Sequence, residues 1–164
     1  MKKIGFTIGK FAPLHKGHQY LIEKGIKETE EFYVVIYDTN VTKIPLEERA
    51  NWIKQIYPEV KILYAKNPPM QYGLDKESVK IQTDYLKNIV KEIPVTDFYS
   101  SEPYGKFVAK YLNVKDNRVD EKRIEIPICA TNIRNNLQKY KEYLSNIVFE
   151  DYSNKIKNLE KMHK

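Results

Sequence analysis

Apolar runs alternate with helical periodicities along most of the chain. Short runs rich in β-branched and aromatic residues predict strands that are buried on both faces. Between them, apolar residues recur every three or four positions, which is the spacing of amphipathic helices. The pattern predicts strands at residues 4–8, 32–37, 60–64 and 97–99, with 123–127 leading into a fifth, and helices at 19–29, 46–57, 77–93, 103–112, 131–136 and 138–146.

The order of these elements predicts the fold class. Strands separated by helices of this length need right-handed crossovers, so they lie parallel in one sheet. We therefore expect a doubly wound, Rossmann-like α/β fold with a five-stranded parallel sheet in a single domain, residues 1–150. Residues 151–164 form a lysine-rich tail, expected to be a peripheral helix or a frayed end. Such sheets bind ligands at the carboxyl ends of their strands, where the winding reverses.

Composition narrows the class of protein. The chain has 164 residues, 41% of them hydrophobic and 30% charged, as is typical of a globular domain with a core. No run is long enough to span a membrane and no secretory signal is seen, so the cytoplasm is the expected location. The net charge of +6 comes from scattered lysines. This scatter favours a solvated surface over a nucleic-acid-binding stripe, and no nucleic-acid partner is expected.

The strongest chemical signal is the turn between the first strand and the first helix, residues 9–18, with the sequence GKFAPLHKGH. A helix N-terminus offers unpaired N–H groups and a partial positive charge, which suit a phosphate. His15 and His18 add hydrogen-bond donors where negative charge develops during a reaction. Lys10 can neutralise part of the phosphate charge. The turn therefore predicts a phosphate site with catalytic donors.

This turn resembles the G-x-F-x-P-x-H-x-G-H signature of the nucleotidyltransferase α/β-phosphodiesterase superfamily. The resemblance implies that the two histidines face the α- and β-phosphates of a nucleoside triphosphate. It also implies nucleotide contacts at three further positions of the turn, namely Gly9, Phe11 and Gly17.

A second segment, residues 128–134 with the sequence ICATNIR, resembles the I-S-x-T-x-I-R element of the same superfamily. It follows an apolar stretch and opens a predicted helix, which Thr131 is expected to cap. The resemblance implies that Cys129, Thr131 and Arg134 bind the nucleotide, with the Arg134 guanidinium on the β- and γ-phosphates. Cys129 stands where the family has serine, so a hydroxyl contact is lost there while a backbone contact is kept.

Weaker motifs narrow the resemblance to the NadR-type nicotinamide-nucleotide adenylyltransferases. Residues 101–105 resemble the S-E-x-Y-G segment of that group, residues 49–53 resemble its R-x-x-W-I helix, and Val119-Asp120 with Arg123 also fits. The P-loop of the kinase domain that often follows in the group is absent from the sequence. The resemblance implies an acceptor site whose candidate residues are Trp52, Tyr72, Ser101, Glu102 and Tyr104.

The implied reaction transfers AMP from ATP to nicotinamide mononucleotide (NMN), giving NAD and pyrophosphate. Mg²⁺ would accompany ATP, held mainly by phosphate oxygens and water, because no cluster of histidines, cysteines and carboxylates has metal-ligand spacing. The motifs that grip a triphosphate do not read the acceptor. Phosphopantetheine, or glycerol or choline phosphate with CTP, therefore stays an alternative. A non-catalytic nucleotide- or RNA-binding module is the alternative of another class, and a homo-oligomer stays open.

Overall fold

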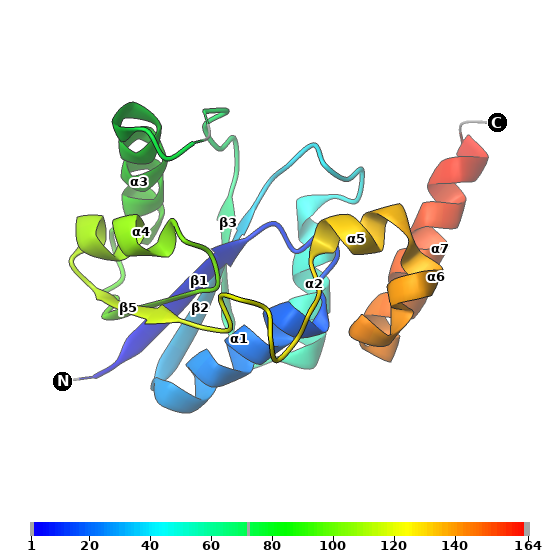
Figure 1. Cartoon of the computed structure of the whole chain (residues 1–164), viewed down its shortest axis with the longest axis horizontal. Coiled ribbons are helices and arrows are strands. Elements are labelled where there is room, and N and C mark those ends of the chain that lie inside the picture. Colours follow the sequence, from blue (N-terminus) through cyan, green and yellow to red (C-terminus); the bar gives the residue numbers. More distant parts are fainter. Residues whose placement is uncertain (1, 72, 163–164) are drawn as a thin grey trace.

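The computed structural model describes residues 2–71 and 73–162, and it shows the predicted α/β fold (Figure 1). Within these residues the strands are β1 (Ile4–Gly9), β2 (Glu31–Tyr37), β3 (Lys61–Ala65), β4 (Asp97–Ser100) and β5 (Lys115–Arg118). They form one five-stranded sheet in the order β3-β2-β1-β4-β5, and every strand pair is parallel. The prediction of a doubly wound, Rossmann-like sheet is confirmed.

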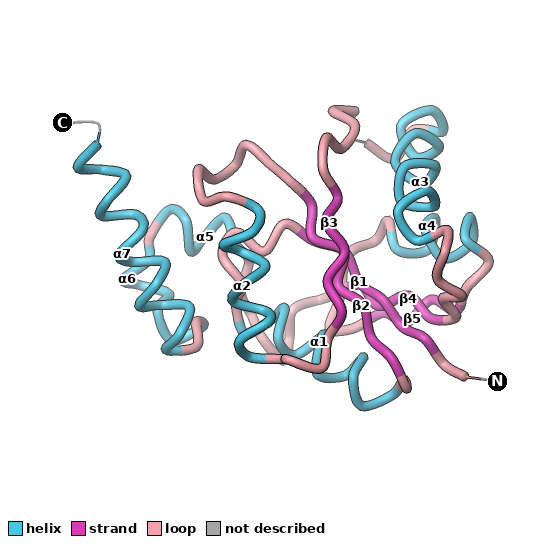
Figure 2. Tube along the Cα trace, turned by 180° about the vertical axis from the view of Figure 1, so that it is seen from behind, coloured by secondary structure: helices cyan, strands magenta, loops and turns pink. Residues whose placement is uncertain are grey.

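Helices cover both faces of this sheet. Helices α1 (Lys16–Glu28) and α2 (Leu46–Ile56) lie on one face, and α3 (Lys76–Val90) and α4 (Gly105–Leu112) lie on the other (Figures 1 and 2). The interior strand β2 contributes side chains to the cores on both faces of the sheet, because alternate side chains of a strand point to opposite faces. Val34 belongs to the core beneath α1 and α2, whereas Val35 belongs to the core beneath α3 and α4. Along the chain the strands β1, β2 and β3 extend the sheet in one direction, and β4 then returns to pair with the other side of β1, so the winding reverses between β1 and β4.

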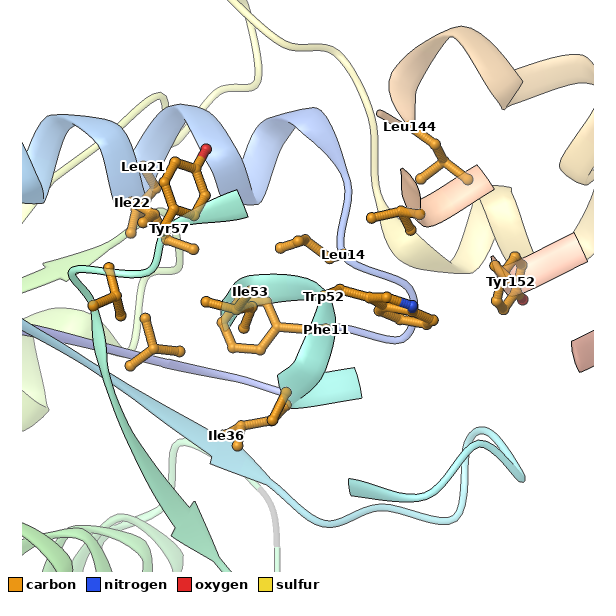
Figure 3. Packing of buried hydrophobic residues seen from close by; sticks show 14 of the residues in the cluster. Phe11, Leu14, Leu21, Ile22, Ile36, Trp52, Ile53, Tyr57, Leu144 and Tyr152 are labelled. Carbon is orange, nitrogen blue, oxygen red and sulfur yellow. The ribbon is translucent and has the colours of Figure 1, made fainter. Parts of the chain in front are cut away.

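The C-terminal part of the chain packs beside α2, away from the sheet. It contains α5 (Ala130–Asn135), α6 (Leu137–Tyr140), the short 3₁₀ helix η1 (Lys141–Tyr143) and α7 (Asn146–Met162). Helix α7 runs on past residue 150, and Tyr152 is buried on it. The ring of Tyr152 is edge-on to the Trp52 indole, with ring centroids 6.2 Å apart; both residues are labelled in Figure 3. Much of the lysine-rich tail is therefore a helix, and its first half is anchored in the core. No helix among the described residues is long and apolar enough to cross a membrane.

The position predicted for the fifth strand is wrong. Residues 115–118, with the polar sequence KDNR, form β5 at the sheet edge and pair with β4. Residues 124–126 form bends instead, and residues 123 and 127 have no regular secondary structure. There the Asp120 carboxylate accepts hydrogen bonds from the backbone N–H groups of Ile124, Glu125 and Ile126, at 2.8, 3.0 and 2.9 Å. A side chain thus takes the donors that a neighbouring strand would need.

Candidate functional site

A cavity of about 580 Å³ lies where the winding of the sheet reverses, as the fold class predicts. Its walls come from the turn after β1, from α3, from the connection between β4 and α4, and from the segment that leads into α5. Segments far apart in the sequence therefore meet at one place. The predicted site residues that line it are Gly9, Lys10, Phe11, His15, Gly17, His18, Ser101, Glu102, Tyr104, Cys129, Thr131 and Arg134.

One candidate acceptor residue, Trp52, is not among the described residues that line the cavity. Trp52 is 1% exposed, and its indole N–H donates to the Asp151 carboxylate at 2.7 Å. Its ring packs against Tyr152 of α7. The expectation for Trp52 is therefore corrected, since the residue anchors the C-terminal helix. Tyr72 lies outside the described residues.

The two histidines hold each other at the N-terminus of α1. His15 is the N-cap residue, and its Nδ1 accepts hydrogen bonds from the backbone N–H groups of Gly17 (3.0 Å) and His18 (3.3 Å). In return, the backbone N–H of His15 donates to Nδ1 of His18 at 3.1 Å. The arrangement is a capping box in which imidazoles replace the usual hydroxyl and carboxylate. The rings stack with centroids 3.6 Å apart.

This capping box determines which nitrogen carries the proton. A ring nitrogen that accepts a hydrogen bond has no proton of its own, so the single proton of each neutral imidazole lies on Nε2. Both Nε2–H groups are then free of the capping box. Because both residues line the cavity, they can serve as donors to a ligand. Gly17 makes room for this pair, since a Cβ atom there would lie 2.8 Å from Cε1 of His15.

Both histidines are held in the neutral form. Burial and, second, the positive charge of Arg123 lower the pKa of His15 to about 3. Burial, followed by the neighbouring charges of His15 and Arg123, also holds the pKa of His18 well below its usual value. At neutral pH the pair therefore supplies uncharged hydrogen-bond donors.

Positive charge in the cavity comes from other residues. Among the described lining residues the lysines and arginines are Lys10, Arg123 and Arg134. Burial, with the charge of Arg134 as the second cause, lowers the pKa of Lys10. Arg134 donates to the carbonyl of Ala12 at 2.9 Å and to the Thr131 hydroxyl at 3.2 Å. Helix α5 begins at Ala130 with Cys129 at its N-cap position and without a side-chain capping hydrogen bond, so the predicted cap at Thr131 is wrong. Arg134 thus ties α5 to the turn after β1.

Arg49 also binds the turn after β1. Its guanidinium is fully buried on α2. It donates to the carbonyl of Ile44 at 3.0 Å, to the carbonyl of Tyr37 at 3.1 Å and to the carbonyl of Lys10. The R-x-x-W-I motif therefore positions the turn from beneath and contributes no cavity wall among the described residues.

Arg123 is a cation of the cavity lining that the set of candidate site residues predicted from the sequence does not include. It lies in the segment predicted to lead into the fifth strand, and it has a left-handed backbone with φ of 53°. Its guanidinium donates to the Ile128 carbonyl at 2.7 Å and to the Glu102 carboxylate at 3.0 Å. The only sequence signal for it is its place in the Val119-Asp120…Arg123 motif.

The part of the cavity that is lined by α3 and α4 is mostly apolar, and it is called the apolar arm below. Helices α3 and α4 contribute side chains such as Leu86, Phe107 and Val108. Gln82 of α3 donates to the carbonyls of Pro69 and Gln71, and so holds the loop after β3 against this arm. An apolar arm beside a polar, cationic one suits a ligand with a flat base and a phosphate.

Comparisons with known proteins agree with this geometry. The family model described as citrate lyase ligase C-terminal domain matches residues 5–69. The trifunctional NAD biosynthesis/regulator protein NadR of Escherichia coli (strain K12) is 27% identical over 161 residues, which cover 87% of this chain and 39% of the relative. The phosphopantetheine adenylyltransferase of Fusobacterium nucleatum subsp. nucleatum is 41% identical over 58 residues, which cover 34% of this chain and 35% of that protein.

Solved structures extend the likeness. A NadR protein in complex with NAD and AMP-PNP superposes with a TM-score of 0.65 at 23% identity, covering 87% of this chain and 44% of that one. A bifunctional NMN adenylyltransferase/ADP ribose pyrophosphatase of Francisella tularensis, complexed with AMP and a manganese ion, superposes with a TM-score of 0.60 at 22% identity. The match covers 89% of this chain and 45% of that one. The chain spans less than half the length of these relatives. The predicted resemblance to NadR-type proteins is confirmed over most of the chain.

Proposed function

We propose that this nucleotidyltransferase domain transfers the AMP moiety of ATP to NMN, with NAD and pyrophosphate as products. The observation that carries the proposal is the mutual capping of His15 and His18, which leaves two Nε2–H donors on residues that line the cavity. The same cavity is lined by Thr131 and Arg134 at the start of α5.

In the proposed reaction an oxygen of the NMN phosphate attacks the α-phosphorus of ATP. The new O–P bond forms as the bond to the bridging oxygen of the β-phosphate breaks, and pyrophosphate leaves with that electron pair. The attacking phosphate is already ionised, so no protein nucleophile or general base is required. The protein acts by positioning the two substrates and by stabilising the charge that develops between them.

The histidines are the donors at the reacting phosphate. Charge grows on the α-phosphate oxygens and on the leaving group, and Nε2–H groups of His15 and His18 can strengthen their hydrogen bonds as it grows. Lys10 and Arg134 carry the positive charge for the β- and γ-phosphates and for the pyrophosphate that leaves. The partial positive charge at the N-terminus of α1 adds to this anion site, while the N–H groups of Gly17 and His18 stay bonded to His15.

A divalent cation is expected to arrive with ATP, and Mg²⁺ is the ion we propose. The carboxylates that line the cavity among the described residues are Glu102 and Asp120. Glu102 is paired with Arg123, and Asp120 accepts three backbone hydrogen bonds. No group of three possible ligands occurs in the part of the chain that the structure describes. This donor set fits an ion held by phosphate oxygens and water, where it neutralises phosphate charge.

NMN is proposed as the acceptor because the likeness to NadR extends beyond the triphosphate motifs. The family model ends at residue 69, before α3 and α4 begin. The match to NadR covers 87% of this chain, and must therefore reach into the segments that line the apolar arm. The nicotinamide ring would lie in that arm, near Tyr104 and Phe107.

The test is an assay of product formation with purified protein, ATP and Mg²⁺. NAD is followed by chromatography and pyrophosphate by a coupled assay, with NMN, 4′-phosphopantetheine, glycerol 3-phosphate and choline phosphate as acceptors and with CTP in place of ATP. We expect pyrophosphate release with ATP and NMN, matched by NAD. Pyrophosphate release with another acceptor, without formation of NAD from NMN, would overturn the proposal that NMN is the acceptor. No pyrophosphate release with any acceptor would overturn the proposed transferase activity.

Variants on one helix link this activity to the histidines. Loss of one well-placed donor costs on the order of 10²–10³ in turnover, so we expect at least that loss for His18→Ala. Tyr20→Ala removes a ring from the same helix outside the cavity lining, and it should keep full turnover. Equal turnover of the two variants would contradict the role given to His18.

A further inference from the structure

We propose that Arg123 binds the phosphate of the acceptor substrate, and that Glu102 holds its guanidinium ready in the cavity. The inference rests on the proposed function, because it assigns one residue to one of the two substrates. The evidence is the position of Arg123 relative to the other cations, its remaining donors, and its backbone conformation.

The cations of the cavity fall into two groups. Lys10 and Arg134 lie near one another, as the effect of the Arg134 charge on Lys10 indicates, and both belong to the triphosphate side. Arg123 is held by Glu102, which follows β4, and by the carbonyl of Ile128, which precedes α5. Yet its charge also acts on both histidine rings. Arg123 therefore lies near the histidines, between the β4–α4 connection and the segment that leads into α5, and we place the acceptor phosphate there.

Arg123 keeps donors for a ligand. A guanidinium has five N–H groups in a planar fork. Among the described residues, one bond from Nη1 goes to the Ile128 carbonyl and one from Nη2 goes to Glu102. Three N–H groups remain, which is enough for the bidentate contact that arginine makes with phosphate. The side chain is 38% exposed, so a ligand in the cavity can reach it.

The local backbone is shaped to present this side chain. Asp120 and Arg123 both have left-handed conformations, with φ of 46° and 53°, which non-glycine residues adopt rarely. The Asp120 carboxylate holds the segment by its three backbone bonds, and the Arg123 N–H donates to the Asp120 carbonyl at 2.8 Å. Such backbone strain concentrates at functional sites. Here it directs a cation into the cavity.

The transfer also needs a cation at this place. The acceptor phosphate is an anion that must approach the α-phosphate of a strongly anionic triphosphate, and neutral histidines cannot offset that repulsion with charge. A guanidinium on the acceptor side lowers the electrostatic cost of bringing the two phosphates together, and it fixes the attacking oxygen in line.

The experiment compares a phosphorylated ligand with its dephosphorylated counterpart. Binding of NMN and of nicotinamide riboside is measured by calorimetry in the presence of Mg²⁺ and α,β-methylene-ATP, an analogue that cannot release pyrophosphate. The ratio of the two dissociation constants reports what the phosphate contributes. It is determined for wild type, Arg123→Gln and Arg123→Lys, together with Lys122→Gln, which removes a neighbouring exposed charge outside the cavity lining.

We expect Arg123→Gln to lower the phosphate contribution by about tenfold to a hundredfold, the usual range for a lost charge-assisted hydrogen bond. Nicotinamide riboside and α,β-methylene-ATP should bind as to wild type. Arg123→Lys should restore part of the loss, and Lys122→Gln should lose nothing. An equal loss for NMN and nicotinamide riboside would show a merely structural role and overturn the inference, and so would a loss confined to the ATP analogue.

The design also separates this inference from the proposed function. If wild-type protein binds neither NMN nor the riboside but does bind 4′-phosphopantetheine, the proposed acceptor fails. The same four proteins are then tested with 4′-phosphopantetheine and pantetheine. A loss restricted to the phosphorylated member of that pair supports the role of Arg123, and a loss shared by both members refutes it.

Discussion

Replacing His15 with asparagine separates the capping role of this residue from its titration. Asparagine is among the best N-cap residues, so the new side chain should still accept the backbone hydrogen bonds at the start of α1. It has no proton to gain between pH 7.5 and pH 5. The catalytic Nε2–H donor is lost, so turnover should fall, while stability at pH 7.5 should stay within about 1 kcal/mol of wild type.

The lowered pKa of His15 determines how the folding stability changes with pH. In the unfolded chain His15 titrates at its ordinary value of 6.5, and in the folded protein its pKa is about 3. Below pH 6.5 the unfolded state therefore binds the proton more readily, so folding stability is present in full above 6.5 and is lost as the pH falls toward 3. At pH 5 this linkage amounts to about 2 kcal/mol for His15. His18 has the same sign.

The assay is urea unfolding of both proteins at pH 7.5 and at pH 5. Carboxylates that titrate in this interval contribute equally to both proteins and cancel in the comparison. Wild type should lose about 2 kcal/mol more stability than His15→Asn between the two pH values. If the two proteins lose the same free energy of unfolding, His15 is not held neutral by the fold, and the tautomer argument for the catalytic pair fails with it.

Three other substitutions test the packing and the site. Gly25→Ala on α1 would place a Cβ atom 2.1 Å from the Phe32 ring, so it should lower the free energy of unfolding by about 1–3 kcal/mol in a urea titration, although alanine favours helices. Trp52→Phe removes the 2.7 Å bond to Asp151 and should cost about 1–3 kcal/mol of stability with no change in the KM for NMN; a raised KM at unchanged stability would return Trp52 to the acceptor site. Arg134→Lys should raise the KM for ATP about tenfold and leave that for NMN alone, because a point charge replaces a bidentate fork; equal changes in both KM values would contradict its place on the triphosphate side.

Much of the fold could be predicted from the sequence because the interior strands carry a strong signal. Residues 32–37 are apolar on both faces, as a strand covered by two helical layers requires. The edge strand β5 carries no such signal, since its four residues are polar and its position depends on pairing with β4, a separate segment of the sequence that no pattern within β5 indicates. Residues 123–127 gave a false signal because Ile124 and Ile126 alternate with polar residues. The Asp120 side chain, which captures the N–H groups of Ile124, Glu125 and Ile126, cannot be recognised from periodicity.

The site was predictable where the chemistry is local. His15, Gly17 and His18 lie within one turn, so their motif specifies their geometry almost by itself. Contacts across the fold behave differently. The direction of the Trp52 side chain depends on its hydrogen bond to Asp151 of α7, a residue 99 positions further along the sequence. Arg123 enters the cavity through a left-handed backbone that no hydrophobic pattern encodes.

The distribution of charge in the cavity explains why neutral histidines suit this site. Full positive charge in the cavity comes from Lys10 and Arg134, which we propose for the triphosphate, and from Arg123, which we propose for the acceptor. Where the two proposed substrates meet, a charged imidazolium would bind the ground-state phosphates tightly and gain little as the reaction proceeds. A neutral Nε2–H donor forms a weaker bond at first, and that bond strengthens as charge builds on the reacting phosphate. Stabilisation that grows toward the transition state raises turnover, whereas uniform binding does not. In the proposed reaction, the capping box thus acts by keeping the protons on Nε2 and the rings uncharged.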